Sequence, residues 1–417
     1  MLLPPLPRGL PPGHRPGDSD VYRPPSGRCP GLPALASRGG KLAEYARSLK
    51  PDTVISANDF DAVMRPSYLI LGIDLPALED YGLPRWEAKE GLLVNNALTL
   101  RVARALAKGT PVSTISYDRG IGFDGVYPPR RFRQAMAEAA ACGAIPVIKG
   151  TEYVERGVFT LLTAAEYAPQ REAIGHYHRW LESHAELYRE WEPAAFVGLL
   201  YPGDTLWQQW PTVAPIFFGA AQTLTAAGIP WRVIQDTDDC SGLDLILDAR
   251  PGAKSQPGGF PRRVGRPSSE PALWARSPWL RNRVQATILR LYRAYFESPF
   301  ARRWFDRMGM VRFFTQSPYF RLPPEPWQQA LLRMLEPLSG PRVEAKNPVL
   351  LEVWQNFRKG TKALHLVNYA DVPQEVRVKV GEKARARLLT PDGEGKELEG
   401  QELSFTLDIY AVILLSG

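Results

Sequence analysis

Cysteine is scarce in this chain, with Cys29, Cys142 and Cys240 the only three among 417 residues. Their wide spacing includes no Cys-x-x-Cys pair and no cysteine and histidine pattern of the kind that binds zinc. An odd and sparse cysteine count is typical of proteins in a reducing compartment. We therefore predict no metal site, no cofactor and a cytoplasmic location.

Long hydrophobic runs are also missing, since no stretch approaches the roughly 18 apolar residues of a membrane span. The N-terminal segment MLLPPLPRGLPP has too short an apolar run for a signal peptide, and its prolines exclude a helix. Basic residues interleaved with aromatics along a strand are absent as well. The formal net charge is +7, but the arginines concentrate in Pro/Gly-rich stretches and on single helix faces. Neither a membrane nor a nucleic acid is the expected partner.

Proline and glycine, in contrast, are plentiful, with 40 and 35 residues, so loops must be common. Residues 1–40 and 249–278 are rich in arginine, proline and glycine and lack hydrophobic periodicity. Such segments bury too little apolar surface to offset their ordering entropy, and we expect little structure in them. One interpretation is a tail and a linker; another is coding sequence that has been translated out of frame.

Strand and helix patterns alternate in residues 41–191. The expected strands are TVISAND, PALEDYG, PVSTISYD and IPVIKG. GLLVNNALTLRVARALAKG predicts a strong helix between the second and third of them, and PPRRFRQAMAEAAACG predicts another before the fourth. This alternation predicts a parallel sheet with functional residues at the carboxyl ends of its strands.

Residues 192–345 show a second alternation, in which AAFVGLLYPGD, IPWRVIQD and LDLILDA read as strands around the helix PTVAPIFFGAAQTLTAAG. This pattern predicts a doubly wound, flavodoxin-like domain with an irregular insert at 249–278. Residues 346–417 hold short strands at near-regular spacing, including EVRVKV and ARARLLTP, and predict a small all-β domain, a β-sandwich.

The order of these parts resembles bacterial glycoside hydrolases of the family 42 β-galactosidase type. The stretches that carry the resemblance are RRFRQAMAEAAACGAIPVIKG, FVGLLYPGD, QTLTAAGIPWRVIQD, ALHLVNYAD and the closing YAVILL. The resemblance implies a (β/α)8 catalytic barrel, a flavodoxin-like trimerisation domain related to glutamine amidotransferases, and a C-terminal β domain. It also implies a carbohydrate substrate and a homo-oligomer, a trimer in the family's usual assembly.

A complete barrel needs about 250 residues and eight strands. Residues 41–191 supply four strands, and IPVIKG looks like the last strand of such a barrel. We therefore expect an α/β chain with a partial (β/α) barrel, its C-terminal half, followed by the flavodoxin-like and all-β domains. The resemblance places the acid/base carboxylate on the fourth strand, which this chain would lack, and the nucleophile on the seventh.

Carboxylates near strand ends are the candidate catalytic groups, because retaining glycosidases use two carboxyl groups about 5 Å apart. Counted back from IPVIKG, PVSTISYD is the seventh strand, so Asp118 matches the nucleophile's place, although the family has a glutamate there. Glu79, on the preceding strand, is the alternative. The glycines that follow Asp118 let the loop fold close to a ligand. We predict Asp118 and Glu79 as catalytic residues.

Further polar and aromatic residues near the same strand ends are predicted to bind the sugar. They are Asn58, Asp59, Tyr81, Trp86, Tyr117, Asp124 and Glu152. Aromatic faces suit the apolar face of a pyranose, but core packing explains aromatics equally well. An aspartate after a strand also commonly caps a helix or forms an Asx-turn. Both interpretations stay open for each residue.

Two other kinds of site are less favoured. His176, His178 and His184 fit a helix surface better than a metal cluster, because residues two apart on a helix face different ways. Cys240 precedes its strand, whereas an amidotransferase nucleophile follows one.

The leading hypothesis is a glycoside hydrolase that acts on β-linked sugars. The alternative is a non-catalytic relative that binds carbohydrate or serves assembly, because unpaired sheet edges predict association.

Overall fold

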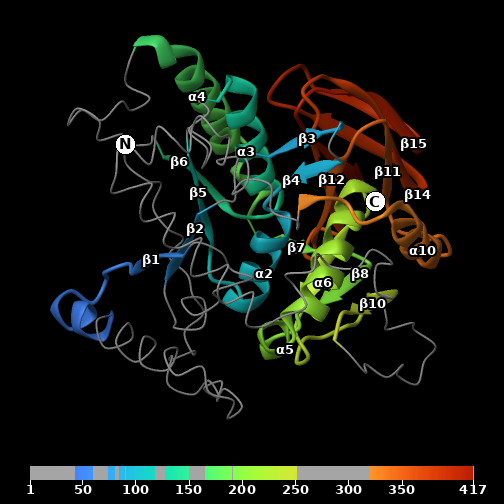
Figure 1. Ribbon diagram of the computed structural model, residues 1–417. Helices are drawn as coiled ribbons and strands as arrows, with labels where there is room; N and C mark the ends of the chain where they lie inside the picture. The colour runs from blue at the N-terminus through green and yellow to red at the C-terminus, as the bar shows by residue number, and fades with distance from the viewer. Residues whose placement is uncertain are drawn as a thin grey trace, which may run out of the picture.

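The structure is a computed structural model. It describes residues 43–59, 74–79, 84–89, 91–117, 127–149, 165–189, 191–250 and 320–416 (Figure 1). The Pro/Gly-rich segment 1–40 and the segment 249–278, apart from its first two residues, lie outside this part. None of the helices within it combines the length and hydrophobicity of a membrane-spanning segment.

Four parallel strands form a curled sheet, the half-barrel of this fold. They are β1 (Ser56–Asp59), β2 (Leu75–Glu79), β5 (Ser113–Tyr117) and β6 (Ile145–Lys149), paired in the order β1-β2-β5-β6. All three pairings are parallel, which confirms the four strands and their arrangement. Asp74 fixes the start of the sheet: it accepts the Ile55 backbone N–H at 2.7 Å and pairs with Arg47 at 2.8 Å.

Helices alternate with these strands along the chain, as the sequence pattern predicts. They are a short helix over residues 43–49, α2 (Ala97–Ala107), α3 (Pro129–Ala141) and α4 (Ala168–Ser183), with the single turns η1 (Ala165–Tyr167) and η2 (Ala185–Leu187) on either side of α4. Proline stands at the first position of α3, where its missing N–H costs nothing. The alanine-rich face of α3 is buried almost completely.

The beginning of the segment predicted as one long helix is instead a strand. Residues 92–94 form β4 (Leu92–Val94), which pairs antiparallel with β3 (Arg85–Glu87), and α2 begins only after Asn96. Leu92 and Val94 pack with Phe320, more than two hundred positions later in the chain. A short apolar run does not distinguish strand from helix. Here the contact with Phe320, far away in the sequence, accompanies the strand conformation.

A second parallel sheet follows in the chain. It contains β8 (Val197–Leu200), β9 (Trp231–Ile234) and β10 (Leu245–Asp248) in the order β10-β8-β9. Its helices are α5 (Asp204–Gln208), α6 (Trp210–Ala226) and, later in the chain, α10 (Glu325–Leu335). The first strand therefore lies in the middle of the sheet, as in doubly wound folds.

The remaining strands form one antiparallel sheet. They are β7 (Glu192–Pro193), β11 (Arg342–Ala345), β12 (Val349–Asn356), β13 (Thr361–Asn368), β14 (Gln374–Leu389), β15 (Lys396–Leu407) and β16 (Tyr410–Ser416). The two predicted strands EVRVKV and ARARLLTP are the halves of β14, whose pairing with β15 shifts between Lys379 and Ala384. β14 pairs with β11 before this shift and with β16 after it, so the sheet folds around its own apolar core.

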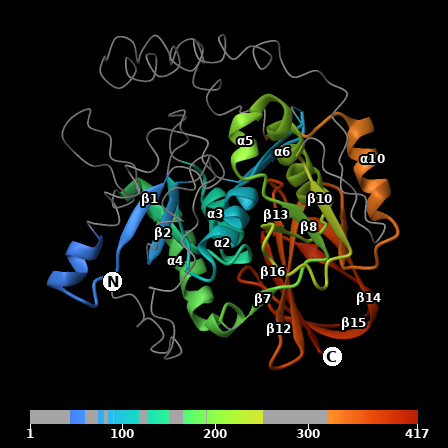
Figure 2. The ribbon, with the colours of Figure 1, turned by 90° about the horizontal axis from the view of Figure 1, so that it is seen from below.

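A second, larger core joins the three sheets, and Figures 1 and 2 show α2 and α3 close to the antiparallel sheet. Gly143, just after α3, has φ +72°, and a Cβ there would lie 2.4 Å from the Trp354 ring of β12. The Trp354 indole N–H donates to the Ala141 carbonyl at 2.9 Å. Only glycine leaves room for this close approach.

Candidate functional site

The carboxyl edge of the half-barrel sheet is where the predicted sugar site lies. Asp59 is paired with Leu78, the residue before Glu79, and Glu79 is paired with Ile115, two residues before Tyr117. Neighbouring parallel strands lie about 4.8 Å apart. The backbones of Asp59, Glu79 and Tyr117 therefore come together at one edge of the sheet.

The structure thus brings some of the predicted residues together and leaves others undescribed. The backbones of Asn58, Asp59, Glu79 and Tyr117 lie at or next to this edge. Asp118 follows β5 directly in the sequence but, like Tyr81, Asp124 and Glu152, lies outside the described residues. The catalytic and binding roles of all of them stay predictions.

The strand that leads to Asp118 is firmly held. Val112, Ser113, Thr114 and Ser116 are all buried, and the Ser113 hydroxyl donates to the Pro76 carbonyl of β2 at 3.3 Å. A small β-branched and hydroxyl-bearing strand packs well between two neighbours in a parallel sheet. The edge at Tyr117 is therefore carried by a rigid element, which is what a catalytic group requires.

Trp86 lies on β3, away from the four parallel strands. Its backbone N–H donates to the Tyr369 carbonyl at 2.9 Å, and its half-buried side chain packs against the main core. The observed contacts of the Trp86 side chain are therefore those of the core-packing interpretation. A sugar-stacking role for Trp86 stays a prediction.

The histidines and Cys240 also have defined surroundings. The Nε2 atom of His176 lies 2.6 Å from the Pro391 carbonyl oxygen, and the Nδ1 atom of His184 lies 2.9 Å from the Trp180 carbonyl oxygen. His178 is exposed on α4. Within the described ranges, no three His, Cys, Asp or Glu side chains group as metal ligands. Cys240 is half-buried ahead of β10.

A buried carboxylate that the sequence reasoning missed lies between α3 and the antiparallel sheet. Glu138 accepts the Asn96 backbone N–H at 3.1 Å and the Tyr369 hydroxyl at 2.6 Å. Burial raises the pKa of Glu138 to about 7, and the hydrogen bonds from Tyr369 and Asn96 oppose that rise. The signal was a lone glutamate in the alanine-rich run MAEAAACG, on a helix face too apolar to be exposed.

Glu138 is expected to make stability depend on pH. Its pKa in the folded protein, about 7, exceeds the ordinary value of 4.5, so between these values the folded state keeps a proton that the unfolded state has lost. Stability from this group is complete below pH 4.5 and is lost as pH rises to about 7, by up to about 3 kcal/mol. Glu138→Gln should remove that loss. Urea denaturation of both proteins from pH 5 to 8 measures the difference.

His365 makes the comparison with the variant necessary. It is fully buried, its Nδ1 atom lies 2.7 Å from the Tyr410 hydroxyl, and burial lowers its pKa to about 3. The contribution of His365 to stability therefore depends on pH in the opposite direction to that of Glu138, and the free energy of unfolding falls as pH drops below 6.5. Only the difference between wild type and Glu138→Gln isolates Glu138. Glu182→Gln, an exposed change on α4, is the control. A wild-type minus Glu138→Gln difference that is constant with pH would contradict the assignment.

Comparison with solved structures gives the class of fold: the similar structures are glycosidases. The chain is similar to a β-galactosidase from Bacillus circulans sp. alkalophilus, with a TM-score of 0.58 and 11% identity over 92% of this chain and 67% of that one. A β-galactosidase from Rahnella sp. R3 gives a TM-score of 0.56, with the same identity and the same coverage of both chains. α-L-Fucosidase isoenzyme 2 from Paenibacillus thiaminolyticus gives 0.51 and 13% identity over 93% of this chain and 71% of that one.

These similarities establish a glycoside hydrolase-like fold. At such low identity they concern the fold alone, and the chain spans about two thirds of the length of these structures. No family model and no curated protein sequence matches the chain.

Proposed function

We propose that this protein is a glycoside hydrolase that acts on β-linked sugars, with Asp118 and Glu79 as its paired carboxylates. One observation carries the proposal. In a fold similar to glycosidases, β1, β2 and β5 run parallel and bring Asp59, Glu79 and Tyr117 to a single carboxyl edge. Function in parallel α/β folds concentrates at that edge.

The chemistry suits two neighbouring strands. Neighbouring strands lie about 4.8 Å apart, and Asp118 comes three residues after Ile115, the residue paired with Glu79. The proposal therefore requires the Glu79 side chain and the backbone after Tyr117 to bring the two carboxyl groups to the roughly 5 Å separation of retaining glycosidases. In such a pair one carboxylate attacks the anomeric carbon, and the other protonates the departing glycosidic oxygen and later activates water. Asn58, Asp59, Tyr81, Trp86, Tyr117, Asp124 and Glu152 are proposed to hold the sugar.

The proposed architecture extends the same likeness. Residues 41–191 would be the C-terminal half of a (β/α)8 barrel, residues 192–345 a flavodoxin-like domain of the trimerisation type, and residues 346–417 a small β domain. The parallel order β10-β8-β9 and the antiparallel sheet support this division. A homo-oligomer in the cytoplasm is part of the same proposal.

A non-catalytic role in carbohydrate binding or assembly is the second candidate, and the β6 edge favours it. Among the described strands β6 has one neighbour only, and its Ile145 and Val147 side chains are 42% and 41% exposed. Exposed β-branched residues on an unpaired edge favour association with another chain. Light scattering tests this: a clean monomer would count against association.

The wild-type chain should hydrolyse at least one nitrophenyl β-glycoside, with galactoside, glucoside, xyloside and fucoside as the panel. The matching α-glycosides serve as controls for specificity, and release of nitrophenol measures the rate. Hydrolysis of a β- but not an α-glycoside supports the catalytic proposal. No hydrolysis of any β-glycoside, with saccharide binding retained, would replace it by the second candidate.

A further inference from the structure

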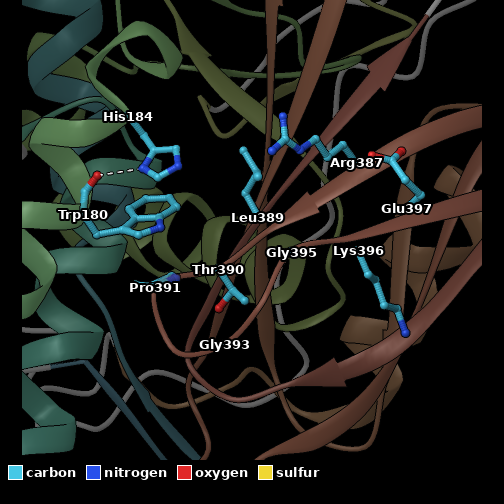
Figure 3. Close-up of a pocket in the computed structure, with 10 residues that line it drawn as sticks. All are labelled: Trp180, His184, Arg387, Leu389, Thr390, Pro391, Gly393, Gly395, Lys396 and Glu397. Carbon is cyan, nitrogen blue, oxygen red and sulfur yellow. Dashed lines mark hydrogen bonds between the residues drawn. The ribbon is translucent and has the colours of Figure 1, made fainter.

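A pocket of about 540 Å³ lies between the C-terminal end of α4 and the turn from β14 to β15 (Figure 3). Trp180 of α4 and His184, the residue directly after α4, line one side, and the other side is lined by Arg387, Thr390, Lys396 and Glu397. None of these residues belongs to the proposed catalytic edge. Volumes of about 300–1,000 Å³ are typical of small-molecule sites.

The walls of the pocket are fixed by contacts across the fold. Asp392, in the β14–β15 turn, pairs with Arg133 of α3 at 3.0 Å and accepts the hydroxyl of Tyr177 of α4. His176 contacts the carbonyl of Pro391, in the same turn, at 2.6 Å. The turn is therefore held against α3 and α4, and the pocket is preformed.

Two ring nitrogens on the α4 side are available to a ligand. Because a carbonyl only accepts hydrogen bonds, the Nδ1 atom of His184, 2.9 Å from the Trp180 carbonyl oxygen, carries the proton of the neutral ring. Its Nε2 atom is then an acceptor, and Figure 3 shows this atom and the Trp180 indole nitrogen facing the pocket. Neither has a hydrogen-bond partner in the part of the chain that the structure describes.

The aromatic rings themselves are held in place. The Trp180 and His184 rings stack at 4.5 Å, and Trp180 meets Tyr410 edge-on at 5.5 Å. The two nitrogens are thus presented at a fixed spacing, one as a donor and one as an acceptor. A polyhydroxylated ligand can satisfy both, because each hydroxyl donates and accepts.

The opposite side of the pocket carries three exposed charges: Arg387, Lys396 and Glu397. Arg387 and Glu397 are opposite each other on β14 and β15. None of the three forms an ion pair with another described residue. Lys396 is paired with Leu388, so its side chain leaves the opposite face of the sheet, and Figure 3 shows its ammonium pointing away from Trp180 and His184. The Arg387 guanidinium therefore supplies the positive charge of the described pocket lining and suits one carboxylate, and Glu397 beside it disfavours a dianionic phosphate.

We propose that this pocket binds a sugar unit that carries one carboxylate, a uronic acid. Its hydroxyls pair with the His184 Nε2 atom and the Trp180 indole N–H, and its carboxylate pairs with the Arg387 guanidinium. The site goes beyond the proposed hydrolytic function and does not depend on it, since it shares no residue with the catalytic edge. Its failure and the failure of the glycoside assay are therefore distinguishable.

The test is a saturation-transfer NMR titration of the full chain with sodium glucuronate, glucose and sodium acetate at constant ionic strength. Glucuronate should bind at least about tenfold more tightly than glucose or acetate, because only it engages both sides of the pocket. Arg387→Gln should weaken glucuronate binding about tenfold or more. Arg385→Gln is the matched control: it is exposed on the same strand two residues earlier but lies outside the pocket lining, and binding should stay within about twofold.

Trp180→Phe gives a second readout, because it keeps an aromatic ring against Tyr410 and His184 and removes only the indole with its N–H. Glucuronate should change the tryptophan fluorescence of the wild type, and the change should disappear in this variant. Equal effects of Arg385→Gln and Arg387→Gln, acetate binding as tightly as glucuronate, or an unchanged fluorescence response in Trp180→Phe would each overturn the proposal. Tighter binding of glucose 6-phosphate than of glucuronate would overturn the carboxylate assignment.

Discussion

Asp118→Asn is expected to lower kcat on the best β-glycoside by about 10²–10⁴-fold, with little change in stability. Asparagine has nearly the same size as aspartate but can neither attack the anomeric carbon as a carboxylate nor exchange a proton. Asp118 directly follows β5, whose buried residues fix the strand against β2. The loss should therefore be chemical, and it is measured as initial rates under saturating substrate.

The role of Asp118 is separable from that of Glu79. If Asp118 is the nucleophile, added azide should restore product formation in Asp118→Ala and give a glycosyl azide of inverted configuration. If Glu79 is the acid/base, Glu79→Gln should slow poor leaving groups far more than nitrophenol. Asp52→Asn, an exposed change at the turn before β1, is the control and should leave the rate unchanged. Wild-type rates in Asp118→Asn would remove Asp118 from the mechanism.

Arg101→Met is expected to lower the free energy of unfolding by about 3–5 kcal/mol, since it leaves the buried Glu352 carboxylate without its paired guanidinium. Arg101 of α2 pairs with Glu352 of β12 at 2.5 Å, and the two side chains are only 4% and 5% exposed. The Arg101 guanidinium also stacks over Trp231 of β9 at 3.8 Å. One side chain thus connects α2 with the antiparallel sheet and with the second parallel sheet, and urea denaturation measures the effect of removing it.

The pair as a whole should matter less than either partner alone. Burial raises the pKa of Glu352, and Arg101 opposes that rise, so Glu352 pays a desolvation cost that Arg101 offsets. Arg101→Met with Glu352→Leu should recover most of the lost stability, because two apolar side chains replace two buried charges. Lys379→Met, at the exposed pair with Glu344, should cost no more than about 1 kcal/mol. A double variant as unstable as Arg101→Met would contradict this account.

The strands of the half-barrel were accessible from sequence because each has its own local pattern. PVSTISY is β-branched and bounded by proline and a glycine-rich stretch, and it became β5. Alternation with helices then required parallel pairing, since a parallel neighbour needs a crossover connection. The same reasoning placed the ends of β1, β2 and β5 at one edge, which is the backbone arrangement observed.

The strand β4 was not accessible in the same way. Leu92, Leu93 and Val94 continue the helical pattern of α2, and Asn95 and Asn96, a residue type favoured at helix N-caps, are the local signal that the helix starts later. The strand conformation of residues 92–94 depends on pairing with β3 and on Phe320, which local propensity cannot see. The long strand β14 was divided in two for a related reason, because Gly381 interrupts its pattern without ending the strand.

The sequence by itself determined the order of the parallel strands and of the main helices between them, because these follow from local periodicity and turn residues. Only the tertiary structure decided where the buried charges and the pocket lie. Glu138 meets Tyr369, Arg101 meets Glu352, and Trp180 faces Arg387 across more than two hundred positions of chain. Such pairs are set by packing between sheets, and no local pattern in either partner encodes the other.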